Sequence, residues 1–104
     1  MDRIFERGML YDFYGELLTE HQRQVYGALV INDMSLSEIA EEYNVSRQGV
    51  HDLIKRCDKI LNNYEDKLCL IKRFKSVREK VYEIESITDD ERVRGLVDQI
   101  LEEM

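Results

Sequence analysis

Apolar residues recur every three or four positions along most of the chain, which is the period of amphipathic helices. The first such stretch covers about residues 2–18, and a second begins at Thr19 and ends at Asn32–Asp33. The predicted buried positions of the first stretch are Phe5, Met9 or Leu10, Phe13 and Leu17. Those of the second are Val25 and Leu29, with Tyr26 and Val30 as further candidates.

Capping boxes indicate where three helices begin. In this pattern a Ser or Thr and a Glu or Gln three residues later satisfy free backbone N–H groups at the helix start. Thr19 with Gln22, Ser35 with Glu38 and Thr88 with Glu91 all fit it. The last pair predicts a final helix, whose apolar positions are Val93, Leu96, Val97, Ile100 and Leu101.

A short helix and a long helix lie between these starts. The short helix carries Ile39, Ala40 and Tyr43 and is predicted to stop at Asn44, a residue type that tolerates left-handed backbone. In the turn that follows, Val45 is the predicted apolar plug and Ser46 the cap of the next helix. The apolar positions of that helix are Val50, Leu53, Cys57, Ile60 and Tyr64.

Two adjacent Asn residues interrupt the long helical pattern. The helix either runs unbroken past Tyr64 or breaks near Asn62–Asn63, and we favour the break because Asn is a poor helix former. A further amphipathic stretch, with Val77, Val81 and Ile84, then continues to about Glu85. The 104 residues include no Pro and only five Gly, which is too few turn formers for an all-β chain. We therefore expect an all-α protein of five or six helices.

Several classes of function find no support in the sequence. The chain has no glycine-rich phosphate loop, zinc-protease motif or hydrolase nucleophile motif, so no catalytic residue is predicted. Cys57 and Cys69 are too few and too far apart for a zinc knuckle or a redox pair. With His21 and His51 they would bind a metal only by a coincidence of the fold, so we expect two buried thiols and no metal or cofactor.

The distribution of apolar and charged residues also argues against a membrane partner. No apolar run reaches the roughly 18 residues that a transmembrane helix needs. Charged side chains are spread through the first ten residues, which argues against a signal peptide. We expect a cytoplasmic protein.

Charge is distributed unevenly along the chain. The formal net charge is −7, but residues 46–80 hold 10 basic and 5 acidic side chains. The segments before and after this one are each strongly acidic. A basic middle segment creates a local positive potential, which matters more to a polyanion than the total charge does.

The segment 34–55 fits a helix-turn-helix, in which the second helix enters the major groove of DNA. Ala40 supplies the small residue where the two helices touch, and Val50 and Leu53 are predicted to hold the second helix to the core.

Five residues of the second helix then point outward, namely Arg47, Gln48, His51, Asp52 and Lys55. Arg pairs with guanine and Gln with adenine in bidentate fashion, whereas Ser46, Lys55, Arg56 and Lys59 are better placed for phosphates. Asp52 would repel the DNA backbone unless it accepts a hydrogen bond from cytosine.

We divide the chain accordingly. Residues 1–64 form the predicted helix-turn-helix domain, with a recognition helix over about 46–61. Residues 65–104 form C-terminal helices that serve for packing or for dimerisation. These helices carry more apolar periodicity than a monomer of this size needs, and helix-turn-helix proteins commonly bind as two-fold dimers.

The segment LTEHQRQVYGALVINDMSLSEIAEEYNVSRQGVHDLIKRCDKIL, residues 18–61, is similar to the C-terminal DNA-binding region of bacterial sigma factors. The matching pieces are Leu36–Ala40, Val45–Arg47, and Val50 with Leu53. The other sigma regions have no counterpart here, so the resemblance implies a sigma-factor-like helix-turn-helix bundle with an additional C-terminal segment.

Nearly the whole chain resembles the YlxM family of small bacterial helix-turn-helix proteins. FERGMLYDFYGELLTEHQRQVYGAL, VSRQGVHDLIKRC and the acidic C-terminal helix carry this resemblance. Members are described as DNA-binding proteins encoded beside genes for the signal recognition particle and its receptor. The resemblance implies DNA binding and a part in that pathway.

Two hypotheses follow. In the first, the protein is a DNA-binding regulator that reads bases with Arg47, Gln48 and His51. In the second, it is an accessory factor that docks on the protein or RNA of the signal recognition particle. The basic residues that could face RNA phosphates in this case are Lys72, Arg73, Lys75, Arg78 and Lys80.

Overall fold

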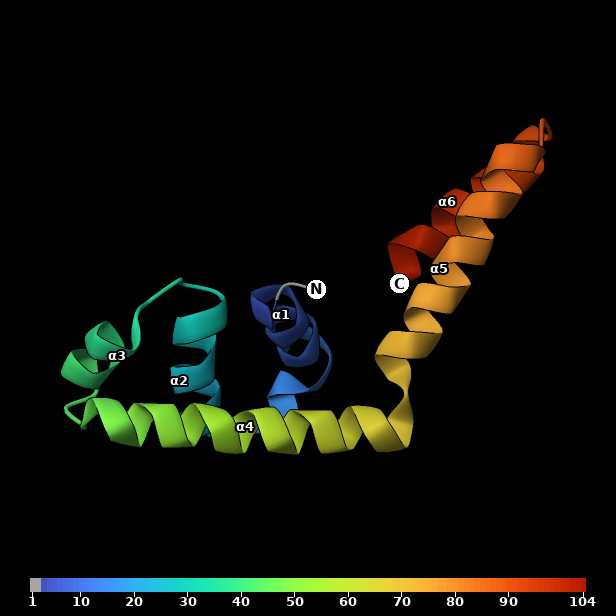
Figure 1. The fold of residues 1–104 in the computed structure, drawn as a ribbon. Coiled ribbons are helices and arrows are strands. Elements are labelled where there is room, and N and C mark those ends of the chain that lie inside the picture. The colour runs from blue at the N-terminus through green and yellow to red at the C-terminus, as the bar shows by residue number, and fades with distance from the viewer. Residues whose placement is uncertain (1–2) are drawn as a thin grey trace. The chain divides into compact units, whose positions relative to one another are not determined.

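The computed structural model describes residues 3–104, and over this range it contains helices and no strand (Figure 1). The elements are α1 (Arg3–Tyr14), a 3-10 turn η1 (Gly15–Leu17), α2 (Glu20–Val30), α3 (Leu36–Glu42), α4 (Arg47–Leu68), α5 (Leu70–Ile87) and α6 (Glu91–Glu103). Their contacts divide the chain into a unit that ends at Cys69 and a second unit, Leu70–Met104. The all-α prediction is confirmed, whereas the division into functional domains stays a prediction.

Two of the three predicted capping boxes are present. The Thr19 hydroxyl accepts from the backbone of Gln22 at 3.2 Å, and the Ser35 hydroxyl accepts from that of Glu38 at 3.1 Å. In return, the Glu38 carboxylate accepts from the Ser35 backbone N–H at 2.9 Å, and this hydrogen bond lowers the pKa of Glu38.

The third predicted box, at the start of α6, is wrong. Asp90 caps this helix instead, and its carboxylate accepts from the Arg92 backbone N–H at 2.8 Å. Thr88 lies two residues earlier, and its hydroxyl accepts from the Asp90 backbone N–H at 3.1 Å. The Asp90 carboxylate replaces the Thr88 hydroxyl as the cap because it lies next to the helix, where it satisfies the Arg92 N–H and complements the helix dipole.

In the first unit, α1, α2 and α3 all pack on one side of α4 (Figure 1). Their contact surface contains seven side chains with less than 2% of their surface exposed. These are Tyr14, Tyr26, Ile39, Leu61, Val25, Val50 and Cys57. α4 therefore serves as the common support for the three shorter helices.

The buried side of α1 differs from the predicted one. Leu10, Tyr14 and Leu18 are buried, whereas Phe5 and Leu17 are each 55% exposed. Tyr14 determines this orientation, because its hydroxyl donates to Glu65 at 2.5 Å and its ring stacks on Tyr64. The 3-10 turn that follows α1 then brings Leu18, rather than Leu17, into the core.

The buried stripe of α4 agrees with the predicted one at Val50 and Cys57 and differs from it at the other positions. Val50, Ile54, Cys57 and Leu61 are buried, whereas Leu53, Ile60 and Tyr64 are only half-buried. Leu53–Ile54 and Ile60–Leu61 are apolar doublets, so a helical period fits either member of each pair. Packing against α1 and α2 selects the second member.

The predicted break at Asn62–Asn63 is wrong. α4 continues to Leu68 and ends where Cys69 adopts a left-handed conformation with φ of 55°. An Asn side chain can disrupt a helix by hydrogen bonding to nearby backbone groups. Here the Asn62 side-chain amide donates to the Asp58 carbonyl one turn earlier, at 2.8 Å, and this hydrogen bond is compatible with the helix. The long helix therefore spans the whole first unit.

The second unit is a hairpin of α5 and α6. Its buried side chains are Ile71, Val81 and Val97. Several large apolar side chains of both helices remain exposed, among them Val77, Ile84 and Leu96. The hairpin core is thus small for the apolar surface that these helices carry.

Candidate nucleic-acid interface

The turn between α3 and α4 has the backbone that the sequence predicts. Asn44 is in the left-handed region with φ of 55°, and the Val45 N–H donates to the Ala40 carbonyl at 3.0 Å. Ala40 is buried at the contact between the two helices. The prediction that Val45 is an apolar plug is wrong, because 46% of it is exposed. The turn is therefore fixed by Asn44 and this backbone hydrogen bond rather than by an apolar anchor.

Ser46 caps α4, and its hydroxyl accepts from the Gly49 backbone N–H at 2.9 Å. Arg47 and Gln48 follow directly and are exposed. The first turn of α4 therefore presents two long polar side chains to solvent from a capped helix start. In a helix-turn-helix, this is the part of the second helix that meets base edges.

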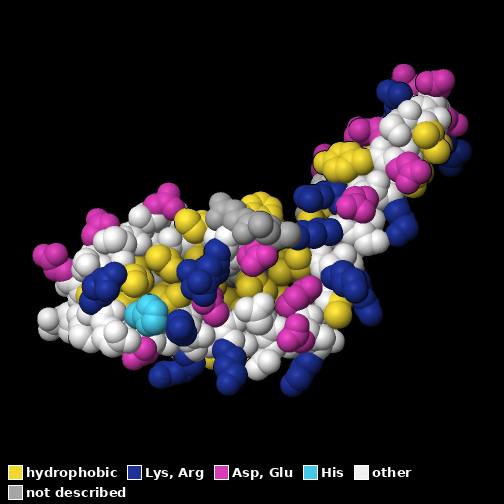
Figure 2. Space-filling view, in the orientation of Figure 1, with side chains coloured by type: hydrophobic (Ala, Val, Ile, Leu, Met, Phe, Trp, Pro, Cys, Tyr) yellow, Lys and Arg dark blue, Asp and Glu magenta, His cyan; other side chains and the backbone are white. Residues whose placement is uncertain are grey.

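Four of the predicted site residues lie on one outward face of α4. Gln48, Asp52, Lys55 and Lys59 recur at spacings of four, three and four and are all exposed. Arg56 is exposed next to them. In Figure 2, Lys and Arg side chains project from the edge of α4 that faces away from α1, α2 and α3.

Asp52 already has partners on its own helix. The Gln48 amide donates to its carboxylate at 3.0 Å, and His51 Nδ1 lies 3.6 Å from the same oxygen. His51 is half-buried, and no residue of the range 3–104 accepts from or donates to its Nδ1 atom. The structure thus groups Gln48, His51 and Asp52, and one oxygen of the Asp52 carboxylate already accepts a hydrogen bond from the Gln48 amide.

A hollow of about 240 Å³ lies beside this face of α4. Its lining includes Arg3 and Arg7 of α1 together with His51 and Lys55 of α4, above an apolar floor of Leu29, Leu36 and Ile54. Arg3 and Arg7 are not among the site residues that the sequence predicts. Their place in an acidic N-terminal segment gave no signal of it, because the proximity depends on how α1 crosses α4.

An ionic cluster fixes α4 to α1 and α2. The Arg7 guanidinium donates to both carboxylate oxygens of Asp58, at 3.0 and 2.7 Å, and the Tyr26 hydroxyl donates to the same carboxylate at 2.6 Å. The side chains of Arg7 and Asp58 are each only 18% exposed, and Tyr26 is fully buried. Asp58 therefore connects three helices, a role that the sequence analysis missed.

The cluster also changes the acidity of its members. Hydrogen bonding to Asp58 raises the pKa of Arg7. Burial, with the bond to Asp58, raises the pKa of Tyr26 well above its ordinary 10.0. Burial, with the nearby Asp58 charge, raises the pKa of Cys57 to about 11. Cys57 is thus a buried thiol as predicted, whereas Cys69 is only half-buried.

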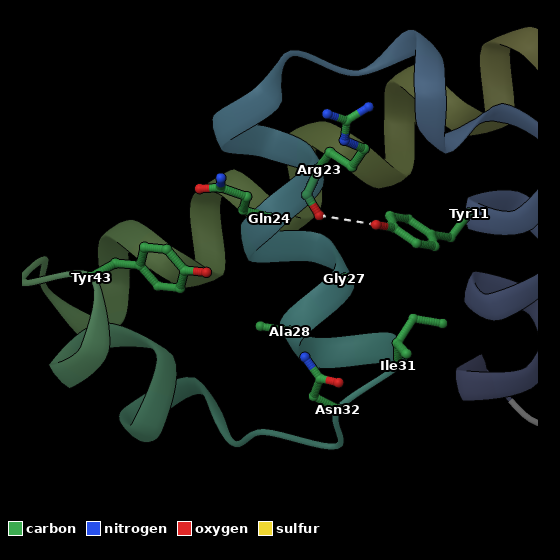
Figure 3. A pocket seen from close by; sticks show the side chains of 8 residues that line it. All are labelled: Tyr11, Arg23, Gln24, Gly27, Ala28, Ile31, Asn32 and Tyr43. Atoms are coloured by element: carbon green, nitrogen blue, oxygen red, sulfur yellow. Dashed lines mark hydrogen bonds between the residues drawn. The ribbon is translucent and has the colours of Figure 1, made fainter.

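A second hollow, of about 440 Å³, lies along α2 between Tyr11 and Tyr43 (Figure 3). Tyr11 approaches α2 from one side, where its hydroxyl donates to the Arg23 carbonyl at 3.3 Å, and Tyr43 lies on the other side. A Cβ atom at Gly27 would lie 2.7 Å from the Tyr11 hydroxyl. Glycine at this position therefore allows Tyr11 to pack directly on the α2 backbone.

None of the helices within residues 3–104 is long and apolar enough to cross a membrane. No group of three or more His, Cys, Asp or Glu side chains in this range is arranged to hold a metal ion.

Comparison with known proteins gives a consistent result. Residues 1–103 match the model of the family described as "UPF0122: Putative helix-turn-helix protein, YlxM / p13 like". The UPF0122 protein of Desulforamulus reducens is 38% identical over 112 residues, covering 98% of this chain and 96% of the relative. That of Bacillus thuringiensis is 39% identical over 103 residues, with 98% and 94% covered. That of Acetivibrio thermocellus is 45% identical over 84 residues, with 81% and 72% covered. The chain therefore belongs to the UPF0122 family of YlxM/p13-like helix-turn-helix proteins.

Proposed function

We propose that this protein binds duplex DNA, with the first turns of α4 in the major groove. One observation carries the proposal: a capped helix start presents Arg47 and Gln48 to solvent, directly after a turn that holds α4 against α3. Arg47 and Gln48 read base edges, with His51 and Asp52 one turn further on. Ser46, Lys55, Arg56 and Lys59 contact phosphates on either side.

The contacts of Asp52 support this assignment. A free carboxylate on the outward face would repel the DNA backbone, but the Gln48 amide already donates to Asp52 at 3.0 Å. In the complex, the Gln48 amide leaves Asp52 and pairs with a base edge, and the Asp52 carboxylate then accepts from a cytosine amino group. Breaking the Gln48–Asp52 hydrogen bond is repaid only where both side chains find base partners, and this requirement gives the pair a sequence preference.

The biological role that we propose is regulation linked to the signal recognition particle pathway. The family match supports the helix-turn-helix part of this proposal. The link to the particle rests on the gene neighbourhood described for YlxM proteins. Two copies of the chain bind together, as is common for helix-turn-helix proteins on paired half-sites.

A fluorescence-anisotropy titration tests DNA binding. Three labelled probes are compared at several salt concentrations: DNA from the protein's own operon, random duplex DNA, and signal recognition particle RNA. We expect tightest binding to the operon DNA and a slope of log K against log salt near −0.9 for each phosphate neutralised. Arg47→Ala and Gln48→Ala should reduce the preference for operon DNA over random DNA by about tenfold.

The matched control is Lys67→Ala, which removes an exposed charge from the same helix outside the proposed interface. A salt-independent signal, or equal effects of Arg47→Ala and Lys67→Ala, would contradict the proposal. Preference for the RNA would instead favour the accessory-factor hypothesis. The feature that supports that hypothesis is the set of exposed basic residues on α5, namely Lys72, Arg73, Arg78 and Lys80.

A further inference from the structure

The hairpin of α5 and α6 exposes four large aliphatic side chains in the middle of its length. The exposed fractions are 46% for Val77, 42% for Ile84, 53% for Leu96 and 40% for Ile100. By contrast, the buried side chains of this unit are Ile71, Val81 and Val97. Since fewer than about 40 residues rarely bury enough apolar surface to be stable alone, a 35-residue hairpin of this kind calls for a partner.

Helix geometry places these four side chains on one face. Each residue advances by about 100° around the helix, so Val77 and Ile84 are rotated by about 40° and 60° from the buried Val81, both in the same sense. On α6, Leu96 and Ile100 are rotated from the buried Val97 by about 100° and 60°, again in that sense. Because α5 and α6 pack antiparallel (Figure 1), equal senses of rotation lead to the same side of the hairpin. The four side chains therefore form a single apolar face, which we call the hairpin face.

Opposite charges border the hairpin face. Arg73 and Lys80, both exposed, lie along its α5 edge, and Glu103 lies along its α6 edge. Lys80 is rotated from Val81 by about 100°, as Leu96 is from Val97, so its aliphatic stem lies against the face while its ammonium group stays at the border. Arg73 is near the start of α5 and Glu103 is at the end of α6, so the antiparallel pairing places both at the same end of the hairpin. A two-fold axis parallel to the helices would place α5 of one copy against α6 of the other. Such a rotation keeps every residue at the same position along the helix axis. Each Arg73 would then face Glu103 of the other copy.

We propose that two copies of this chain pair through their hairpin faces and form a four-helix bundle. Val77, Ile84, Leu96 and Ile100 make its apolar centre, and two symmetric Arg73–Glu103 ion pairs border it. This reciprocal charge match favours a second copy over an unrelated partner, because one surface supplies both charges in the geometry that a two-fold axis requires. The inference deepens the proposed binding of two copies to DNA, but the dimer exists without DNA and is measured without it.

Light scattering of the full chain at tens of micromolar tests the dimer directly. We expect the mass of two chains for the natural sequence. Leu96→Asp and Ile84→Asp place a carboxylate in the apolar centre and should raise the dimer Kd by at least about tenfold. Tyr82→Asp is the matched control, since Tyr82 is 51% exposed on the opposite side of α5 and should leave the mass unchanged.

A charge exchange tests the proposed symmetry without disturbing the apolar centre. Arg73→Glu and Glu103→Arg should each weaken the dimer, and the two changes combined should restore it. Circular dichroism of every variant confirms that helix content is kept. A mass of one chain for the natural sequence, or a dimer that resists both Leu96→Asp and Ile84→Asp, would overturn the inference. A dimer that forms as expected but binds no DNA would contradict only the proposed function.

Discussion

The Asp58 carboxylate accepts three hydrogen bonds, two from Arg7 on α1 and one from Tyr26 on α2. In the sequence, Asp58 is one of five acidic residues in the basic segment 46–80, and none of its sequence neighbours indicates a structural role for it. In the folded chain it neutralises the half-buried Arg7 and satisfies a fully buried hydroxyl. Asp58, one of four acidic residues that offset the basic charge of α4, is thus a residue that fixes α4 to α1 and α2.

Replacing Asp58 with Asn should therefore destabilise the protein strongly. The amide cannot neutralise the Arg7 guanidinium, and it offers one acceptor oxygen in place of two. We expect a loss of about 2–3 kcal/mol in the free energy of unfolding. Urea denaturation measures it, with Asp66→Asn as the control because Asp66 is exposed on the same helix. Equal losses for the two variants would show that Asp58 contributes no more than a surface carboxylate.

The raised pKa values of Cys57 and Tyr26 predict a loss of stability in alkali. The pKa of Cys57 rises from 9.0 to about 11, and that of Tyr26 also lies above its ordinary 10.0. As pH rises above about 9, the unfolded chain releases protons that the folded chain retains, so the free energy of unfolding decreases between about pH 9 and 11. Urea midpoints measured across this range should fall. The decline should be shallower in Tyr26→Phe and in Cys57→Ala, and an unchanged slope in both would exclude these two groups as its cause.

At the level of the elements, the capped start of α4 connects local sequence to the proposed interface. The Ser46 hydroxyl satisfies the Gly49 backbone N–H, and Arg47 and Gln48 belong to the turn that this hydrogen bond orders. A change that loosens the first turn of α4 should therefore affect DNA binding as well as stability.

Ser46→Ala should lower the free energy of unfolding by about 1 kcal/mol. It should also weaken binding to operon DNA, because Arg47 and Gln48 lose their ordered backbone. The control is Ser37→Ala in α3, where the hydroxyl is exposed and does not cap the helix. Urea denaturation and anisotropy are measured on the same preparations. If Ser37→Ala changed both quantities as much as Ser46→Ala, capping would not be the cause.

The features that the sequence predicts correctly are local ones. Two capping boxes, the left-handed Asn44 and the Ser46 cap each depend on residues within a few positions of one another. The exposure of Gln48, Asp52 and Lys55 follows from the helical period. By contrast, the choice of Ile54 over Leu53 as the buried residue depends on how α1 and α2 cross α4. Arg7 and Tyr26 contact Asp58 although they lie 51 and 32 residues from it in the sequence. A local sequence pattern cannot predict contacts between residues so far apart.

For the whole molecule, the uneven charge distribution determines how DNA binding should depend on salt. The net charge of −7 repels DNA at long range, so association relies on the basic residues of α4 at close approach. Of these, Lys55, Arg56 and Lys59 are exposed on its outward side.

Lys55→Ala and Lys59→Ala should each weaken binding to all DNA sequences alike. Each should also reduce the magnitude of the salt slope by about one, since each removes a single phosphate contact. Arg47→Ala should differ by changing the preference among sequences. The salt titration of the three variants separates these effects, and a slope that neither Lys variant changes would place the phosphate contacts elsewhere.

The left-handed Cys69 at the end of α4 also marks a position at which the chain can be truncated. A chain that ends at Tyr64, where the Asn pair suggested a boundary, would lack Glu65, which accepts from the hydroxyl of the buried Tyr14. A chain that ends after Cys69 would keep that acceptor and the last hydrogen bond of α4, from the Cys69 N–H to the Glu65 carbonyl. The five residues between these two end points should decide whether a shortened protein is recovered folded or is lost to aggregation and proteolysis during expression.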